Sequence, residues 1–232
     1  MDAHTEEKNF NHSCVSIVPI FNKLEHEELT WITELSHSKR FKKNEFILQP
    51  LDSYNHLYII HTGKVKVFRM TESGNEQLTR LLVPGDFMGE LALFSEITND
   101  SFAEALSDTE VCMIQRSDFQ KILLKHPSTY MKVIEELSRR LDRAEKQVIQ
   151  LNTQDVEIRL ASFIIELSKV QETLRIILPT SKKDLASYLG TTQETMSRKL
   201  STLESKKIIK RSGQRNIHIL DLQALQQIVD AS

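Results

Sequence analysis

The spacing of apolar side chains divides the chain into regions of different periodicity. Residues 22–36 place Leu24, Leu29, Ile32 and Leu35 at helical intervals, which predicts a short amphipathic helix. From about residue 40 to residue 115, short runs of β-forming residues alternate with turn-forming ones. The predicted strands are 46–48, 57–61, 64–70, 77–83, 102–106 and 110–115. Strands this short and closely spaced are typical of a small barrel or roll.

A helical pattern returns after this region. Residues 119–125 predict a short helix, and Pro127 stands where a new helix can begin, because proline suits the first helical position. Beyond it, apolar residues alternate at intervals of three and four, as in the a/d seam of a coiled coil. The seam residues are Ile134, Leu137, Leu141, Ala144, Val148 and Leu151.

The charged residues between the seam positions, Glu136 and Arg140 among them, are expected to face solvent. So narrow an apolar stripe is best buried against an identical one, which predicts a parallel homodimer. Packing of this helix on its own β-region is the alternative. Asn152 and Thr153 end the seam and are interpreted as a hinge, and residues 156–170 predict a further helix.

The last third of the chain carries the most specific pattern. Thr180 is expected to cap one helix, and Thr192 a second. Gly190 permits the sharp turn between them. The second helix should bury Met196, Leu200 and Leu203. Residues 208–220 predict two strands around a Ser-Gly turn, so the whole segment is typical of a winged helix-turn-helix.

The exposed face of the second helix carries side chains that can hydrogen-bond to DNA bases and phosphates. An arginine can bond bidentately to guanine and a glutamate can accept from cytosine N4, while lysines bind phosphates without sequence preference. The candidate DNA contacts are Gln193, Glu194, Ser197, Arg198, Lys199, Thr192, Thr180 and Lys182. A mere surface pair between Glu194 and Arg198 is the alternative.

The positive charge of this end of the chain suggests a polyanionic partner, with a solvated basic face as the alternative, which charge alone would favour. The 232 residues carry a net charge of −2. Residues 179–215 contain nine basic and three acidic side chains, a net charge of +6. No run of about 20 apolar residues suits a membrane span, and the polar N-terminus is unlike a secretory signal. A cytoplasmic protein without membrane contact is therefore expected.

Enzymatic chemistry is not indicated. No nucleophile, base and orienting group occur together, and the eight histidines lack the spacing of metal ligands. Two cysteines, Cys14 and Cys112, are too few for a disulfide scaffold. We expect neither an enzyme nor a metal site.

Two segments resemble the CRP/FNR family of transcription regulators. They are VPGDFMGELALF at residues 83–94 and LASYLGTTQETMSRKLSTLE at residues 185–204. The resemblance runs from about Ile20 to the end of the chain. It implies an α+β protein with an N-terminal β-roll sensor domain (1–126), a dimerisation helix (127–152) and a winged helix-turn-helix domain (153–232). It also implies a homodimer that binds double-stranded DNA and works with RNA polymerase, as activators of this family do.

The resemblance places the effector pocket at Gly89, Glu90, Leu91, Asp100 and Ser101. Members that bind cyclic AMP have an arginine where this chain has Asp100. A carboxylate facing a phosphate in a desolvated pocket is repulsive. Positions that offer hydroxyls to the adenine are Ala144 and Glu145 here. Cyclic AMP is therefore not the expected effector, and a cyclic-nucleotide module of a non-transcriptional protein is disfavoured for the same reason.

Within the family, the E-x-x-S-R pattern of Glu194, Ser197 and Arg198 is similar to the fumarate–nitrate branch. This implies palindromic sites with TTGA-type half-sites, read by two helices about 34 Å apart. Gln193 differs from the residue that either branch has at this position, so the identity of the outer base of each half-site is not predicted.

The fumarate–nitrate branch often uses an iron–sulfur cluster with four cysteine ligands, which two cysteines cannot supply. Cys112 stands where that branch keeps its internal ligand, and Cys14 precedes the VPIF segment. The chain resembles two-cysteine relatives from low-GC Gram-positive bacteria, which suggests a thiol–disulfide switch with Cα atoms within about 7 Å. Cys14 is expected on an accessible segment. An unidentified small ligand and no effector at all are the alternatives.

Overall fold

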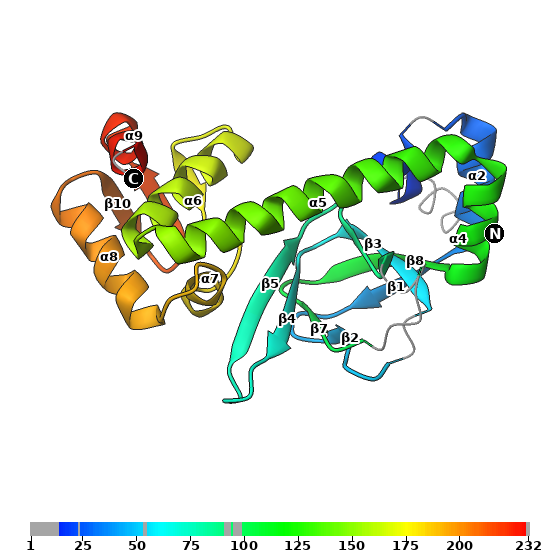
Figure 1. Ribbon diagram of the computed structural model, residues 1–232, viewed down its shortest axis with the longest axis horizontal. Helices are drawn as coiled ribbons and strands as arrows, with labels where there is room; N and C mark the ends of the chain where they lie inside the picture. The colour runs from blue at the N-terminus through cyan, green and yellow to red at the C-terminus, as the bar shows by residue number, and fades with distance from the viewer. Residues whose placement is uncertain (1–13, 23, 53–54, 91–93, 95–98, 231–232) are drawn as a thin grey trace, which may run out of the picture. The chain divides into compact units, whose positions relative to one another are not determined.

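The computed structural model describes residues 14–22, 24–52, 55–90, 94 and 99–230. The chain divides into two compact units, one formed by Met1–Met70 and Thr79–Arg140 and the other by Thr71–Leu78 and Leu141–Ser232. The division falls inside helix α5 (Pro127–Thr153), which is continuous (Figure 1). The three domain boundaries expected from the resemblance stay a prediction.

Two four-stranded antiparallel sheets have strand orders β1-β8-β3-β6 and β2-β7-β4-β5. Their strands belong to the first unit, except that residues 76–78 at the start of β5 belong to the second. The strands are β1 (Ser36–Phe41), β2 (Phe46–Leu48), β3 (His56–Thr62), β4 (Val65–Met70), β5 (Glu76–Leu82), β6 (Phe87–Met88), β7 (Phe102–Ala105) and β8 (Thr109–Gln115). The described helical segments of the first unit include η1 (Pro19–Phe21), α2 (His26–Glu34), α4 (Arg116–Lys125) and the start of α5. The predicted β-roll and its six strands are confirmed within a residue or two.

Strand β3 explains why the roll lacks a clean alternation of apolar and polar residues. Four consecutive residues, from Leu57 to Ile60, are buried. Leu57 and Ile59 pack in a cluster with Phe119 of α4, whereas Tyr58 and Ile60 pack inside the roll. Both faces of this sheet are covered, so successive side chains enter two different cores.

Strand β1 was not predicted. Its sequence, SHSKRF, has four exposed residues between Ser36 and Phe41. Among the described strands it lies at the edge of its sheet and pairs with β8, Ser38 opposite Cys112. An edge strand with a solvated face needs few apolar residues, so its sequence lacks the pattern of a strand.

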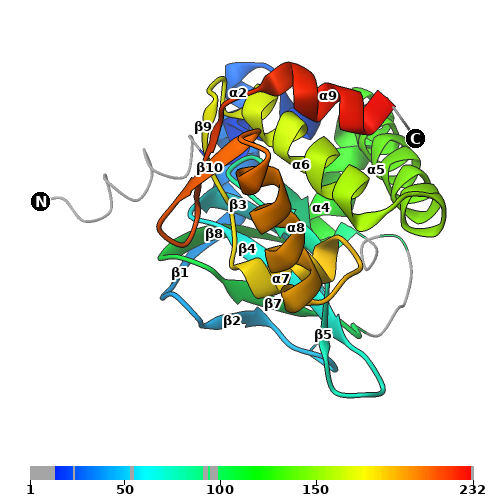
Figure 2. The same cartoon turned by 90° about the vertical axis from the view of Figure 1, so that its left-hand side faces the viewer.

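The second unit contains the end of α5, helices α6 (Val156–Val170), α7 (Lys182–Tyr188), α8 (Gln193–Ser205) and α9 (Leu222–Asp230), and strands β9 (Arg175–Ile177), β10 (Ile209–Ser212) and β11 (Asn216–Ile219). Helix α6 lies beside α9, and α8 packs near α7 (Figure 2). Strands β10 and β11 form the expected wing hairpin, and β9, which was not predicted, extends it to three strands. One apolar cluster, with Leu160, Leu185 and Met196 at 0% exposure, joins helices α6 to α9 and the three strands.

Candidate functional site

Helix α8 is stabilised by its buried face and by the residue that caps its start. Met196, Leu200 and Leu203 are all fully buried, as predicted. Thr192 is the N-cap, and its hydroxyl accepts a hydrogen bond from the Thr195 N–H at 3.2 Å. This bond satisfies one of the N–H groups that a helix leaves unpaired at its start.

The opposite face of α8 carries the predicted reading residues. Gln193, Glu194 and Arg198 are exposed and Ser197 is half-buried. At 100° per residue all four lie on one side of the helix, away from Met196. Backbone hydrogen bonding at its own N–H, and then the Thr192 hydroxyl, hold the pKa of the Glu194 carboxyl below its ordinary value. Glu194 therefore presents a charged acceptor at neutral pH.

Three other predicted contacts lie elsewhere. Lys199 is on the flank of α8 and donates to Glu157 of α6 at 2.8 Å, which lowers the pKa of that carboxyl. Thr180 is 1% exposed, and its hydroxyl donates to Asp184. The N-cap of α7 is Ser181, so the expected cap at Thr180 is wrong by one residue. A hydroxyl this buried cannot reach a phosphate, whereas Lys182 in the first turn of α7 is partly exposed.

The wing, formed by β10 and β11, is hydrogen-bonded to α8. The Arg211 guanidinium of β10 bonds to the Glu204 carboxylate through Nε at 2.8 Å and Nη2 at 2.6 Å, and Nη2 also donates to Ser201 Oγ at 3.1 Å. The Arg211 backbone N–H, followed by its side chain, lowers the pKa of Glu204. The hairpin turn follows at Gly213, whose φ is +67°. Both side-chain bonds end on Glu204 Oε2, and the Arg211 backbone N–H donates to Oε1 at 2.8 Å, so these charge-assisted bonds join the start of the wing to the end of α8.

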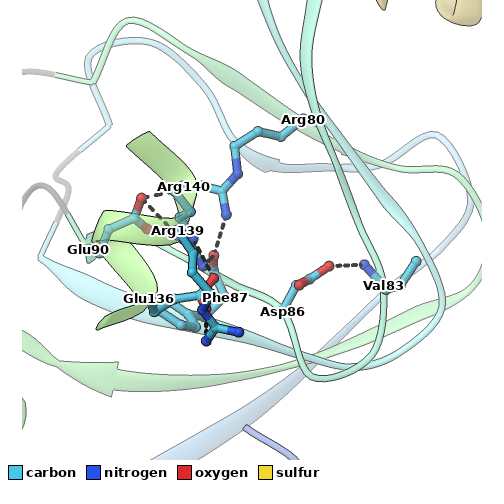
Figure 3. A network of polar contacts seen from close by, with 8 residues as sticks. All are labelled: Arg80, Val83, Asp86, Phe87, Glu90, Glu136, Arg139 and Arg140. Carbon is cyan, nitrogen blue, oxygen red and sulfur yellow. Dashed lines mark hydrogen bonds and ion pairs between the residues drawn. The ribbon is translucent and has the colours of Figure 1, made fainter. Parts of the chain in front are cut away.

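In the first unit, Glu90 lies within a cluster of charges (Figure 3). Its Oε1 atom is 3.0 Å from Arg140 of α5 and 3.3 Å from Arg80 of β5. Arg140 also lies over the Phe87 ring, 4.0 Å from the centroid, and donates to Glu136 at 3.0 Å. The side chains of Arg140 and Glu136 are only 17% and 13% exposed. The expectation that both face solvent is therefore wrong, because this side of α5 packs on the roll.

The remaining pocket residues also have partners within the chain. Arg69 forms an ion pair with Asp100 at 3.0 Å and donates to Ser101 Oγ at 3.3 Å. Gly89 has a φ of +95°, and a Cβ there would lie 2.2 Å from the His56 carbonyl oxygen, so only glycine fits. Leu91 lies outside the described residues.

Cys14 and Cys112 form a disulfide with Cα atoms 6.5 Å apart. The separation meets the limit of about 7 Å expected for the pair and is within the usual range for disulfides. Both side chains are fully buried against Val15, Ile59 and Phe119. The expectation that Cys14 is accessible is wrong for this oxidised form. Ser38 Oγ lies 3.5 Å from Cys112 Sγ.

The seam of α5 is largely exposed in the single chain. Ile134, Leu141, Val148 and Leu151 are 53%, 61%, 57% and 38% exposed, and Ala144 is exposed as well. Leu137 is partly buried against the first unit's core. Large apolar side chains in a row along one helix are unusual on a monomer surface.

Some residues of these sites are not predicted by the sequence patterns. Arg140 is distant from Glu90 in sequence, the ten-residue separation of Arg80 from Glu90 fits no local pattern, and Ser38 lies on the unpredicted edge strand. Only the E-x-x-x-R spacing of Glu136 and Arg140 hinted at a helical ion pair. Among the described residues, no group of three or more histidine, cysteine or acidic side chains could hold a metal ion. None of the described helices is long and apolar enough to cross a membrane.

A capped helix with a solvated polar face, a preceding helix and a wing define a DNA-binding domain of the winged helix-turn-helix class. Family models agree: the cyclic nucleotide-binding domain matches residues 38–126, and the Crp-like helix-turn-helix domain matches residues 158–228. The chain belongs to the CRP/FNR family of transcription regulators.

Relatives and solved structures support this assignment along most of the chain. The probable transcriptional regulator flp of Lacticaseibacillus casei is 33% identical over 93% of this chain and 97% of its own length. The fumarate and nitrate reduction regulatory protein of Vibrio cholerae is 27% identical over 99% of this chain and 91% of its own. The structure of FixK2 from Bradyrhizobium japonicum superposes with a TM-score of 0.73 at 27% identity, over 83% of this chain and 96% of that one.

Proposed function

We propose that this regulator binds DNA as a homodimer and reads a palindrome of TTGA-type half-sites with its two α8 helices. The observation that carries the proposal is the exposed face formed by Gln193, Glu194, Ser197 and Arg198 on a capped helix. In the major groove, Arg198 would bond to guanine and Glu194 to cytosine N4. Lys182 would bind a phosphate. On promoter DNA the bound dimer would contact RNA polymerase, the partner that the family resemblance implies.

Selection of sites from a random duplex library, with the oxidised and the reduced protein in parallel, tests the DNA-reading proposal. We expect two-fold symmetric sites whose half-sites have centres about 10 base pairs apart, because two helices of a dimer enter successive major grooves on one side of the duplex. Enrichment of sites without symmetry, or without a TTGA-type half-site, would contradict it.

The α5 seam is the proposed dimer interface. Its a/d spacing and its exposure on the single chain favour a second copy of the same helix as the occupant. Replacing Leu141 by glutamate should raise the dissociation constant of the dimer at least about 100-fold, because two unpaired carboxylates would be buried in the seam. Analytical ultracentrifugation measures this. Lys146→Gln changes the net charge equally but lies off the seam, so it should leave the dimer intact; equal effects of both variants would refute the interface.

We propose that the Cys14–Cys112 pair is the sensor, and that its conversion between disulfide and dithiol changes DNA affinity. The support is the pairing of these two cysteines in one of the first unit's two core clusters, where β3, β8 and α4 also contribute residues. Oxidised glutathione would serve as the two-electron acceptor, releasing two molecules of glutathione as the protein disulfide forms. An unidentified small ligand in the roll is the alternative.

We propose no cofactor for the roll, neither cyclic AMP nor a four-cysteine iron–sulfur cluster. Glu90, which would bind a ribose hydroxyl, is engaged by Arg80 and Arg140, and Asp100 is engaged by Arg69. A cyclic phosphate would have to approach Asp100 against its charge. Titration calorimetry with cyclic AMP should give no binding up to about 1 mM, a limit set by about 4 kcal/mol of binding free energy. Micromolar binding would overturn the assignment.

A further inference from the structure

The end of the dimerisation helix and the turn of the helix-turn-helix belong to one compact unit. Residues from Leu141 onward group with the DNA-binding domain, and the division of the chain falls between Arg140 and Leu141. The hinge expected at Asn152 and Thr153 therefore lies inside this unit. The segment that connects α5 to α6 is held by specific contacts.

Arg159, in the first turn of α6, is the centre of these contacts. It is 8% exposed, and its guanidinium donates to three backbone carbonyls. Nε donates to Leu189 O at 2.9 Å, Nη2 to Gly190 O at 3.5 Å, and Nη1 to Gln154 O. One planar fork thus joins the connection after α5 to the turn before α8. A buried charge is retained only where such partners satisfy it.

Two side chains of α5 reach the same turn. Gln147 Nε2 donates to the Tyr188 carbonyl at 3.2 Å. Leu151 Cδ2 lies 2.4 Å from the position of a Cβ on Gly190, whose φ is +62°. The positive φ of Gly190 favours glycine, and the Leu151 side chain packs against it. We call Gln147, Leu151 and Arg159, together with the segment 188–190 that they contact, the turn clamp.

The turn clamp lies directly before the reading helix. Gly190 precedes the N-cap Thr192 by two residues, and the Thr191 N–H is bound by the Ala186 carbonyl. The position of this turn therefore sets where α8 begins. Since α5 is the proposed dimer helix, a rigid connection to it would also set the distance and orientation between the two α8 helices of a dimer.

We infer that Arg159 is a positioning residue for palindrome recognition, which makes the end of α5 and α8 move as one body. The inference rests on the proposed reading of palindromes. Binding of two half-sites by one dimer gains affinity only when the geometry lets both helices engage at once. Loss of the clamp should therefore weaken binding to the full palindrome and leave binding to one half-site unchanged.

The test uses the full-length dimer and a palindrome selected by the wild-type protein from a random library. Duplexes with the half-site spacing changed by one and two base pairs, and a single half-site, are titrated alongside by fluorescence anisotropy. For Arg159→Met we expect affinity for the palindrome to fall at least about tenfold. Half-site affinity should stay within about twofold, and the preference for one spacing should flatten. Arg159→Lys, which keeps the charge and part of the hydrogen bonding, should restore part of the preference.

Lys169→Met is the matched control, because it removes a positive charge from the same helix at an exposed position. It should preserve the spacing preference. An Arg159→Met protein with the wild-type spacing profile would overturn the inference, as would a parallel loss of half-site and palindrome binding, which indicates a structural role alone. If Arg159→Met does not fold, the same comparison of palindrome, altered-spacing and half-site affinities is made with Arg159→Lys. A wild-type spacing profile for that variant would then overturn the inference. Failure of the wild type to select any palindrome would instead refute the proposed function.

Discussion

Reduction of the Cys14–Cys112 disulfide is expected to lower the free energy of unfolding by about 2–4 kcal/mol, because the bond restricts the unfolded chain. The two cysteines are 98 residues apart, so the bond closes a large loop and the restriction is substantial. Urea denaturation of the wild-type protein with and without a reductant measures the difference. In the absence of urea, the affinity for the selected palindrome should differ between the oxidised and the reduced protein.

Cys14→Ser provides the control for the disulfide. Its stability and its DNA affinity should be the same with and without reductant, because it cannot form the bond. Titration of free thiols should find none in the oxidised wild type under denaturing conditions and two after reduction. If the wild type and Cys14→Ser respond alike to the reductant, the cysteines are not the sensor.

Replacing Arg198 by alanine should cost about 1–3 kcal/mol of specific binding and relax specificity at one base pair. The side chain is exposed on the outer face of α8, away from its buried side, so folding should be unaffected. Titrating the variant against the selected palindrome and against its substitutions at each position measures both effects. Unchanged binding to the palindrome would show that Arg198 does not read a base.

Lys183→Ala is the matched comparison for Arg198→Ala. Lys183 is exposed in the first turn of α7 next to Lys182, the proposed phosphate contact, and we expect it to contact phosphate as well. Its loss should weaken binding to all sequences about equally and reduce the slope of affinity against salt by about one. A change in base preference for Lys183→Ala would mean that the two roles are assigned wrongly.

The sequence by itself determined the parts that depend on local patterns. The seam of α5, the α6 helix at residues 156–170 and the inward face of α8 were predicted with nearly the observed bounds. Thr192 was recognised as an N-cap because capping depends on residues within one turn. The order of a β-roll, a long helix and a winged helix also followed from the changes in periodicity along the chain.

Only the tertiary structure decided which distant residues meet. Nothing in the spacing of Glu90, Arg80 and Arg140 indicates their ion pairs, and Arg140 has the sequence environment of a solvated helix face. Strand β1 forms because β8 offers it a hydrogen-bonding edge, not because of its own residues. Arg159 similarly looks like an ordinary charged residue in an amphipathic helix. Its burial among three carbonyls depends on chain segments up to 31 residues away, and such long-range packing leaves no local periodicity to read.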